Sequence, residues 1–250
     1  MKTNKSFKFW QWWTIIVSMV VYSIFYFVRK NFSIAMPGLT AEYGISNTSF
    51  GIIIAIGSLI YGLSRFVNGF IVEKVSTKVF MAIGLLLCAA ANFCFGFGVD
   101  LSYLITGVHE GPQFINTLVL IMGVTIVLNQ YFQGFGYPPC ARMLPQWIAP
   151  GELSTKMSIW NTSHSIGAFV AAVICGYLTS WQMCFWVPAT ISLVGVFFIF
   201  VTLRDTPKSV GLPELPKVEG ELDEEKGRDK KEWRKFLVKK VFLNPVVWIL

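Results

Sequence analysis

Charge is scarce in this sequence. Asp, Glu, Lys and Arg together make up 14% of the 250 residues, whereas soluble domains usually carry about 25%. Hydrophobic residues account for 54% of the chain, and its mean hydropathy is +0.57. The composition therefore predicts an integral membrane protein rather than a water-soluble domain.

Several chemical signatures are absent as well. The sequence contains no phosphate-cradling loop that ends in Gly-Lys-Ser/Thr, which argues against ATP hydrolysis. Its apolar stretches hold no paired acids, no nucleophile beside a base and no metal-binding cluster, so neither an enzyme nor a cofactor is expected. The five cysteines have no metal-ligand spacing and are expected to be free thiols.

The net charge of +7 does not indicate a nucleic-acid partner. Eleven of the twenty-one basic residues follow Val201, where nine acidic residues accompany them. Three more, Lys2, Lys5 and Lys8, lie at the N-terminus. Basic residues at helix ends orient a membrane protein and contact anionic head groups, so the expected partner is the lipid bilayer.

Six stretches are long and apolar enough to cross a membrane, which takes about 20 residues. The first is not a cleavable signal, because it is long, contains Arg29 and lacks a small-residue cleavage site. It is expected to stop at Pro37-Gly38, and the fourth stretch at Pro138-Pro139. The expected spans are residues 12–36, 49–72, 79–99, 115–137, 157–178 and 183–203.

Lys and Arg are confined to alternate loops. The loops on the side of the N-terminus each have at least one, among them Lys8, Lys74, Lys156 and Arg204, whereas the opposite loops have none. Cytoplasmic loops carry an excess of Lys and Arg. The sequence therefore predicts six spans with both ends of the bundle in the cytoplasm.

A charged segment with several prolines follows the sixth span. It has an acidic run at 221–225 and a basic run at 226–240, and such a composition does not fold alone. Its last part, residues 230–241, is expected to form an amphipathic helix on the membrane surface. The predicted division is a transmembrane bundle at 1–203, a cytoplasmic linker at 204–241 and the start of a truncated seventh helix at 242–250.

Three basic residues lie within the apolar stretches. Charge in the bilayer interior costs about 2.5 kcal/mol or more per residue and usually serves a function. Tyr22, Tyr26 and Arg29 are spaced i, i+4 and i+7, which places two phenols and a guanidinium on one helical face. The alternative for Arg29 and Lys30 is that their side chains extend to the outer head groups.

Arg65 lies in the second expected span, and no expected span contains an acid. Guanidinium binds phosphate bidentately and stays charged. The missing partner of Arg29 and Arg65 is therefore predicted to be an anion brought by a substrate. The alternative is an acid in a missing half of the fold. His164, in the fifth span, is either a donor to the same anion or an ordinary packed histidine.

A series of short motifs, which follow one another from residue 26 to residue 245, covers most of the chain. They are YFVRKNF at 26–32 with Met36-Pro37 following, YGLSRF at 61–66, GFIVEKVSTK at 69–78, FQGFGYPPCAR at 132–142, WNTSHSIG at 160–167, LRDTP at 203–207, GLP at 211–213 and LNP at 243–245. Together they resemble the organophosphate:phosphate antiporters of the major facilitator superfamily. Gly69, Glu73, Lys74 and Lys78 resemble the signature loop of that superfamily, although its late glycine is absent.

The resemblance implies an all-α fold of twelve helices in two halves that rock around a shared site, of which this chain is the N-terminal six-helix bundle. It implies that Arg29 binds phosphate with help from His164. The family's second phosphate-binding arginine lies in the seventh helix, and a lysine replaces Arg65 in the glycerol-phosphate transporter. The predicted substrate site consists of Arg29, Arg65, His164, Tyr26, Tyr22, Gln133 and Lys30.

The leading prediction is an inner-membrane antiporter that exchanges an organic phosphate, above all a hexose phosphate, for inorganic phosphate. The runner-up is a membrane sensor of external sugar phosphate that signals to a kinase partner. The linker and the LNP motif at 243–245 favour the sensor. A membrane enzyme acting on phosphate esters is the third class, and the missing catalytic sets disfavour it.

Overall fold

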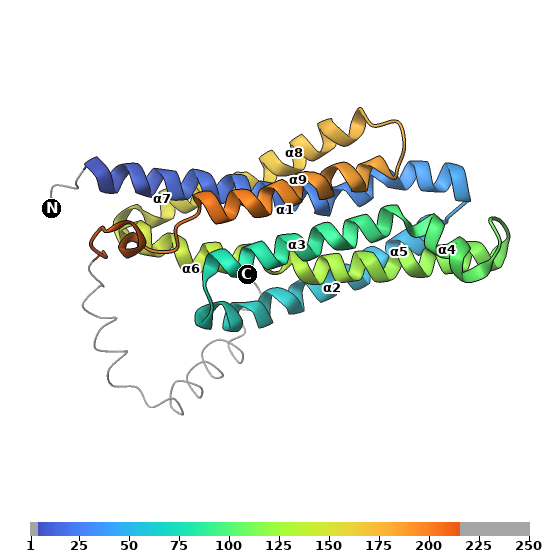
Figure 1. Ribbon diagram of the computed structural model, residues 1–250, viewed down its shortest axis with the longest axis horizontal. Coiled ribbons are helices and arrows are strands. Elements are labelled where there is room, and N and C mark those ends of the chain that lie inside the picture. The colour runs from blue at the N-terminus through green and yellow to red at the C-terminus, as the bar shows by residue number, and fades with distance from the viewer. Residues whose placement is uncertain (1–4, 216–250) are drawn as a thin grey trace, which may run out of the picture. The chain divides into compact units, whose positions relative to one another are not determined.

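The computed structural model describes residues 5–215, which are mostly helical and contain no β-strand (Figure 1). The predicted all-α class is therefore confirmed. The expected amphipathic helix at 230–241 and the seventh helix at 242–250 lie outside the described residues. The helices are α1 (Lys5–Tyr43), α2 (Asn47–Ile71), α3 (Thr77–Gly96), α4 (Gly98–Thr106), α5 (Pro112–Gln133), α6 (Tyr137–Trp147), α7 (Pro150–Asn161), α8 (Ser163–Gly176) and α9 (Met183–Thr202), with 3₁₀ turns η1 (Val72–Lys74) and η2 (Pro207–Val210).

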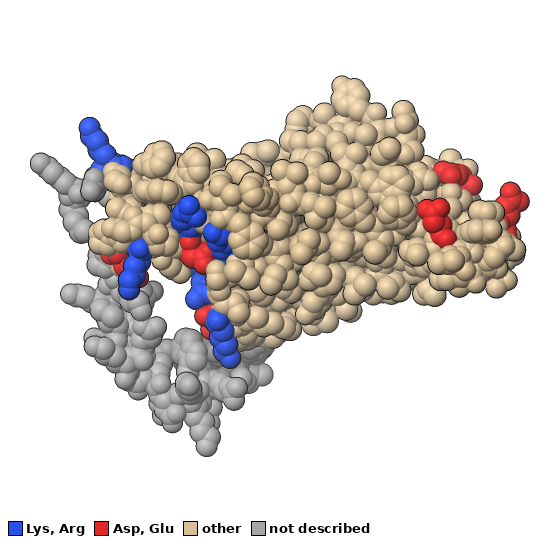
Figure 2. Space-filling model, in the orientation of Figure 1, with Lys and Arg blue, Asp and Glu red and all other residues tan. Residues whose placement is uncertain are grey.

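Within residues 5–215, six helical segments are long and apolar enough to cross a membrane, and they match the six predicted spans one to one. On the face shown in Figure 2, Lys and Arg lie at one end of the bundle and none appears in the long band beyond it. Such a band suits the hydrocarbon core of a bilayer. The six segments are Lys5–Tyr43, Asn47–Lys74, Thr77–Gly96, Pro112–Trp147, Pro150–Gly176 and Met183–Thr202.

The first span does not stop at Pro37-Gly38, so that prediction was wrong. The helix α1 runs on to Tyr43 and ends at Gly44, which has a φ of 65°. Proline removes one backbone donor from a helix. Packing of the following turn offsets this loss, since Leu39 is fully buried. Tertiary contacts therefore override the local preference of proline for a helix end.

The prolines at 138 and 139 begin a helix instead of ending one, which corrects the second expected stop. The helix α5 ends at Gln133, and α6 starts at Tyr137 with both prolines in its first turn, where a missing N–H costs little. Between them, Gly134 lies against Ser64 of α2, and a Cβ there would collide with the Ser64 side chain. The glycine thus permits close approach of the junction to α2.

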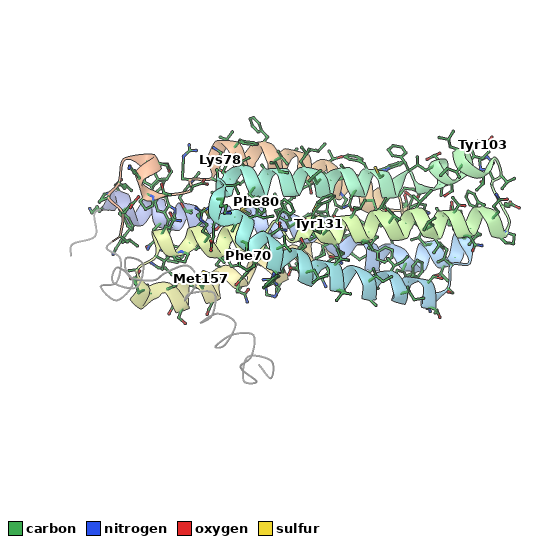
Figure 3. All side chains as sticks on the ribbon, turned by 90° about the horizontal axis from the view of Figure 1, so that it is seen from below. Phe70, Lys78, Phe80, Tyr103, Tyr131 and Met157 are labelled. Atoms are coloured by element: carbon green, nitrogen blue, oxygen red, sulfur yellow. The ribbon has the colours of Figure 1, made fainter. Side chains whose placement is uncertain are left out.

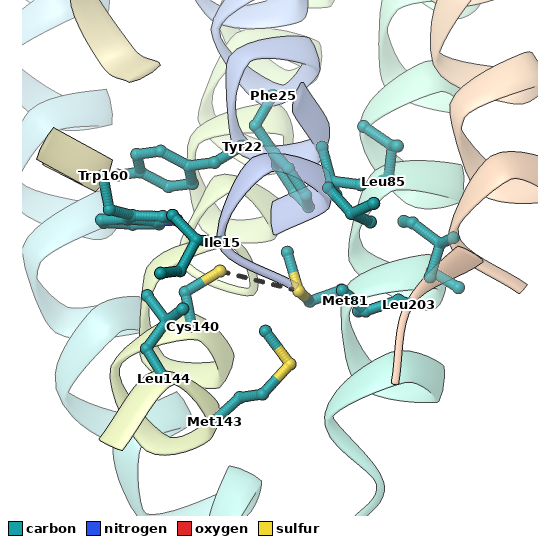
Figure 4. Packing of buried hydrophobic residues seen from close by; sticks show 14 of the residues in the cluster. Ile15, Tyr22, Phe25, Met81, Leu85, Cys140, Met143, Leu144, Trp160 and Leu203 are labelled. Carbon is teal, nitrogen blue, oxygen red and sulfur yellow. Dashed lines mark hydrogen bonds between the residues drawn. The ribbon is translucent and has the colours of Figure 1, made fainter. Parts of the chain in front are cut away.

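Two apolar clusters fill the bundle along α1. Helix α1 packs against α8 and α9, and α3 packs between α9 and α5. Helix α2 packs against α5. Figure 4 shows the first cluster, in which Ile15 and Phe25 of α1 lie among side chains of α3 and α6, including Met81 and Cys140. The second cluster contains Phe32, Phe95 and other residues nearer the end of α1. Helix α1 therefore contributes to both clusters, as do α3 and α9.

The first residues after α9 also pack on the bundle. Pro207 is buried, and Leu212 lies against the first apolar cluster. Asp205 accepts hydrogen bonds from the Ser76 hydroxyl at 2.7 Å and from the Lys78 backbone N–H at 3.1 Å. The charged composition of this segment gave no indication of these contacts.

We expect Gly167→Ala to destabilise the bundle. A Cβ at Gly167 of α8 would lie 2.6 Å from the Ser23 carbonyl oxygen and 2.8 Å from the Ser23 Cα, so the backbones of α8 and α1 must move apart. Overpacking of this kind costs about 1–3 kcal/mol. Thermal unfolding in detergent should show a lower Tm. The matched control is Gly176→Ala on the same helix, where nothing lies within 4 Å; equal Tm values for the two variants would contradict the prediction.

Candidate functional site

Two arginines from different helices share one tyrosine ring. The guanidinium carbon of Arg29 on α1 lies 3.9 Å from the ring centre of Tyr61 on α2, and that of Arg65 lies 5.5 Å from the same centre. Arg65 also lies 4.2 Å from the ring centre of Tyr137 on α6. A cation over an aromatic face is attracted by the ring quadrupole. The aromatic rings therefore hold both positive charges next to each other.

Further rings extend this arrangement to α7 and α8. Tyr26 lies 5.5 Å from the Arg29 guanidinium and 5.8 Å from the His164 ring. Tyr22 lies 5.5 Å from the Tyr26 ring and 4.9 Å from the Trp160 ring. We call these residues the cation–aromatic cluster, whose members are Tyr22, Tyr26, Arg29, Tyr61, Arg65, Tyr137, Trp160 and His164. Five of the seven substrate-site residues expected from sequence are thus brought together.

No acid of the described chain neutralises the two arginines. Within residues 5–215 the one ion pair joins Lys156 and Glu152, 2.5 Å apart at the start of α7. Arg29 and Arg65 are both half-buried, and a charge in such a position requires compensation. Within residues 5–215, the aromatic faces attract both guanidinium groups but do not cancel their charge. The cluster therefore retains the capacity to bind an anion.

The ring of His164 is oriented by its own helix. Its Nδ1 contacts the Asn161 carbonyl, and since a carbonyl only accepts, Nδ1 carries the proton. The Nε2 atom is then the acceptor of a neutral ring and becomes a second donor when the ring is protonated. His164 therefore has one nitrogen free of this local contact for a ligand.

Gln133 and Lys30 lie apart from the cation–aromatic cluster. Gln133 is 4% exposed, and its Nε2 donates to the Phe25 carbonyl of α1 at 3.0 Å. This amide thus joins α5 to α1. Lys30 is exposed and lines, with Arg29, a separate cavity between α1, α2 and α5.

Three asparagines fix the backbone of α1 beside Arg29. Asn129 of α5 donates to the Val28 carbonyl at 2.6 Å, and Asn92 of α3 donates to the same carbonyl at 3.3 Å. Asn92 also donates to Asn129 Oδ1 at 3.3 Å and accepts from Asn31 Nδ2 at 2.6 Å. All three side chains are buried. The network therefore sets the position from which the Arg29 side chain leaves α1.

The signature loop between α2 and α3 is held through its backbone. Arg142 of α6 donates to the Val72 carbonyl and, at 2.7 Å, to the Val75 carbonyl. Asp205 accepts from the Lys78 N–H, as described above, and Lys78 lies near Phe80 and far from Tyr103 along the bundle (Figure 3). The side chains of the predicted loop residues Glu73 and Lys74 are exposed, and a Cβ at Gly69 would meet nothing within 4 Å.

Sequence reasoning did not select Tyr61, Tyr137 or Trp160 as site residues, nor Arg142 and Asp205 as supports of the loop. A signal for Tyr61 was present, because it precedes Arg65 by four residues and must share its helical face. The others belong to different segments, since Tyr137 and Arg142 lie on α6, Trp160 lies on α7 and Asp205 follows α9. Their roles depend on interhelical distances that no spacing within one helix reports.

The sequence is similar to a known protein family and to several of its members. The sequence matches the family model described as Major Facilitator Superfamily over residues 18–250. It is 35% identical, over 88% of this chain and 45% of the relative, to a probable hexose phosphate transport protein of Chlamydia trachomatis. It is 31% identical to the glycerol-3-phosphate transporter of Bacillus subtilis, over 92% of this chain and 50% of that protein.

A third relative is a sensor. The membrane sensor protein UhpC of Escherichia coli is 28% identical over 98% of this chain and 53% of its own length. The chain therefore spans about half the length of the curated relatives it matches. The resemblance predicted from the motifs is confirmed.

We expect Asn92→Leu to lower the stability of the bundle by about 1–2 kcal/mol, because it removes a donor from the Val28 carbonyl and leaves Asn129 Oδ1 without its partner. Chemical or thermal unfolding in detergent measures the change. The control is Asn116→Leu on α5, an exposed position outside the network. The network would lose its assigned role if both variants unfolded like the unmodified protein.

Proposed function

This chain belongs to the major facilitator superfamily, and we propose that it transports an organic phosphate ester across a cell inner membrane in exchange for inorganic phosphate. The proposed ester is a hexose phosphate. The observation that carries the proposal is the pair Arg29 and Arg65, which share the Tyr61 ring and have no acidic partner in residues 5–215. The names of the Chlamydia and Bacillus relatives support the same substrate class.

The cation–aromatic cluster suits a phosphate by its chemistry. A guanidinium stacked on a ring keeps its edge N–H groups available, and these bind phosphate oxygens in a bidentate manner. The Tyr26 ring lies beside Arg29, and His164 lies beside Tyr26, so both residues offer further polar atoms. Lys30 adds positive charge in the cavity that Arg29 also lines. We propose no bond making or breaking, so the protein is not an enzyme; binding lowers the barrier to the rocking of two halves.

The proposed arrangement in the membrane follows the predicted division. Residues 1–203 are proposed to form the transmembrane bundle, and the segment that follows them is proposed to be a cytoplasmic linker. A second six-helix half, which supplies the other side of the site, completes the transporter. The N-terminus and the linker face the cytoplasm, as the loop charges favour. The signature loop with Gly69, Glu73, Lys74 and Lys78 then lies on the cytoplasmic side and takes part in gating.

A sensor of external sugar phosphate is the second candidate. One observation favours it: the similarity to the Escherichia coli sensor extends over 98% of this chain. In that case the same cluster would bind the sugar phosphate, and the helices would report binding to a membrane kinase. The two candidates differ in transport, not in recognition.

Exchange in liposomes distinguishes the candidates. The complete protein is reconstituted with labelled inorganic phosphate inside, and glucose 6-phosphate or glycerol 3-phosphate is supplied outside. A transporter releases label in exchange for at least one ester. Binding of the ester without release of label would identify the sensor instead. If the protein neither binds the ester nor releases label, the proposed recognition of phosphate esters is refuted.

We expect Arg29→Lys to abolish exchange, a loss of roughly 10²-fold or more, because one ammonium cannot reproduce the two parallel hydrogen bonds of a guanidinium. The initial rate of label release is the measurement. Arg204→Lys is the matched control, since Arg204 lies after α9 and contacts the neighbouring Leu203 carbonyl. Near-normal exchange by the Arg29 variant would remove Arg29 from the site.

A further inference from the structure

The polar cavity that Arg29 and Lys30 line lies beyond Arg29 along α1. It has a volume of about 140 Å³ and is enclosed by α1, α2 and α5, with Arg29, Lys30 and Ser33 contributed by α1 and Ser58 by α2. Helix α1 is continuous from Tyr22 through Arg29 to Ser33. The rings of Tyr22 and Tyr26 precede Arg29, and Ser33 follows it by one turn. The cavity and these rings therefore lie on opposite sides of Arg29 along the helix.

The side chain of Gln130 on α5 forms part of the cavity wall. Its Oε1 is buried and accepts no hydrogen bond from any residue that the structure describes. A buried acceptor without a donor is unfavourable, and a ligand that donates to it relieves this cost. Gly57 of α2 lies against Gln130, because a Cβ at Gly57 would be 3.1 Å from the Gln130 Cγ. The close approach of α2 thus restricts the position of this amide.

The other wall groups define what kind of ligand fits. Arg29 and Lys30 are donors that carry positive charge, and the hydroxyls of Ser33 and Ser58 both donate and accept. The neighbouring Asn129 is already engaged, since its amide donates to the Val28 carbonyl and accepts from Asn92. The dianionic phosphate group of an ester only accepts hydrogen bonds, so it satisfies the cations and leaves Gln130 Oε1 unpaired. A hydroxyl group accepts hydrogen bonds from Arg29 and Lys30 and can also donate one to Gln130 Oε1.

The volume sets the size of the ligand. A cavity of 140 Å³ is close in size to one of about 150 Å³ that holds a six-carbon ring. This is room for a short hydroxylated carbon chain and is too small for a sugar phosphate as a whole. Because Arg29 belongs to both the cavity and the cation–aromatic cluster, it marks the junction of two adjoining subsites.

We propose that this cavity is the hydroxyl-binding subsite of the transporter. It binds the hydroxylated arm of the phosphate ester while Arg29 binds the phosphate, and Gln130 Oε1 accepts a hydrogen bond from an ester hydroxyl. The subsite makes a hydroxylated ester bind more tightly than inorganic phosphate and than esters without hydroxyls. The inference rests on the proposed binding of phosphate esters and adds to it the part that recognises the organic group.

Competition with labelled inorganic phosphate tests the subsite in the complete protein. The competitors are glycerol 3-phosphate, glucose 6-phosphate and propyl phosphate, which has a three-carbon chain without hydroxyls. The unmodified protein should prefer at least one hydroxylated ester to propyl phosphate. We expect Gln130→Leu to reduce this preference about tenfold, the effect of losing one buried hydrogen bond. Ser58→Ala should change the preference in the same direction.

Gln113→Leu is the matched control, because Gln113 lies exposed at the start of the same helix and should leave the preference unchanged. An unchanged preference in both the Gln130 and Ser58 variants would overturn the subsite, as would an equal loss of propyl phosphate and hydroxylated esters. Failure of the proposed function would look different, because the unmodified protein would then bind none of the phosphate compounds. In that case the proposed subsite would be refuted as well.

Discussion

The arrangement of the bundle depends on the pairing of buried polar groups in a medium without water. Hydrocarbon offers no hydrogen bonds, so a polar group within the span is stabilised only by a partner in the protein or in a bound ligand. Asn92 and Asn129 meet this demand together at the Val28 carbonyl, and Gln133 does so three residues earlier at the Phe25 carbonyl. Helices α3 and α5 are thereby tied to the centre of α1. The position of Arg29, which follows Val28, is a consequence of these bonds.

Interruptions of the helices bring the aromatic rings to the arginines. The break at residues 134–136 separates α5 from α6 and precedes Tyr137, while the break at Thr162 follows Trp160 and precedes His164. A Cβ at Gly136 would lie 3.3 Å from the Phe25 ring, so the first break also needs a small residue. Irregular backbone at membrane depth is tolerated where protein or a cavity covers it. Here it delivers side chains of three helices to one place.

The charge balance of the site explains why a ligand is expected there. Aromatic faces attract a guanidinium but do not cancel its charge. In the described part of the chain, neither Arg29 nor Arg65 has an acidic partner, so the field around Tyr61 stays positive. Arg29 faces this cluster with its guanidinium and also borders the cavity of Gln130. Recognition of an anion and recognition of a neutral polar group are therefore adjacent on a single helix.

The sequence alone determined the class of the protein, the number of spans and the shared face of Tyr22, Tyr26 and Arg29. Hydropathy, length and helical periodicity are local properties, and in a bilayer they leave few alternatives. The tertiary structure decided the rest. Pro37 lies within α1 because Leu39 packs in the core, Gln133 is bonded to α1, and Tyr61 joins two arginines from different helices. Each of these outcomes depends on the distance between helices, which is set by packing and by buried hydrogen bonds and leaves no periodic trace in the sequence.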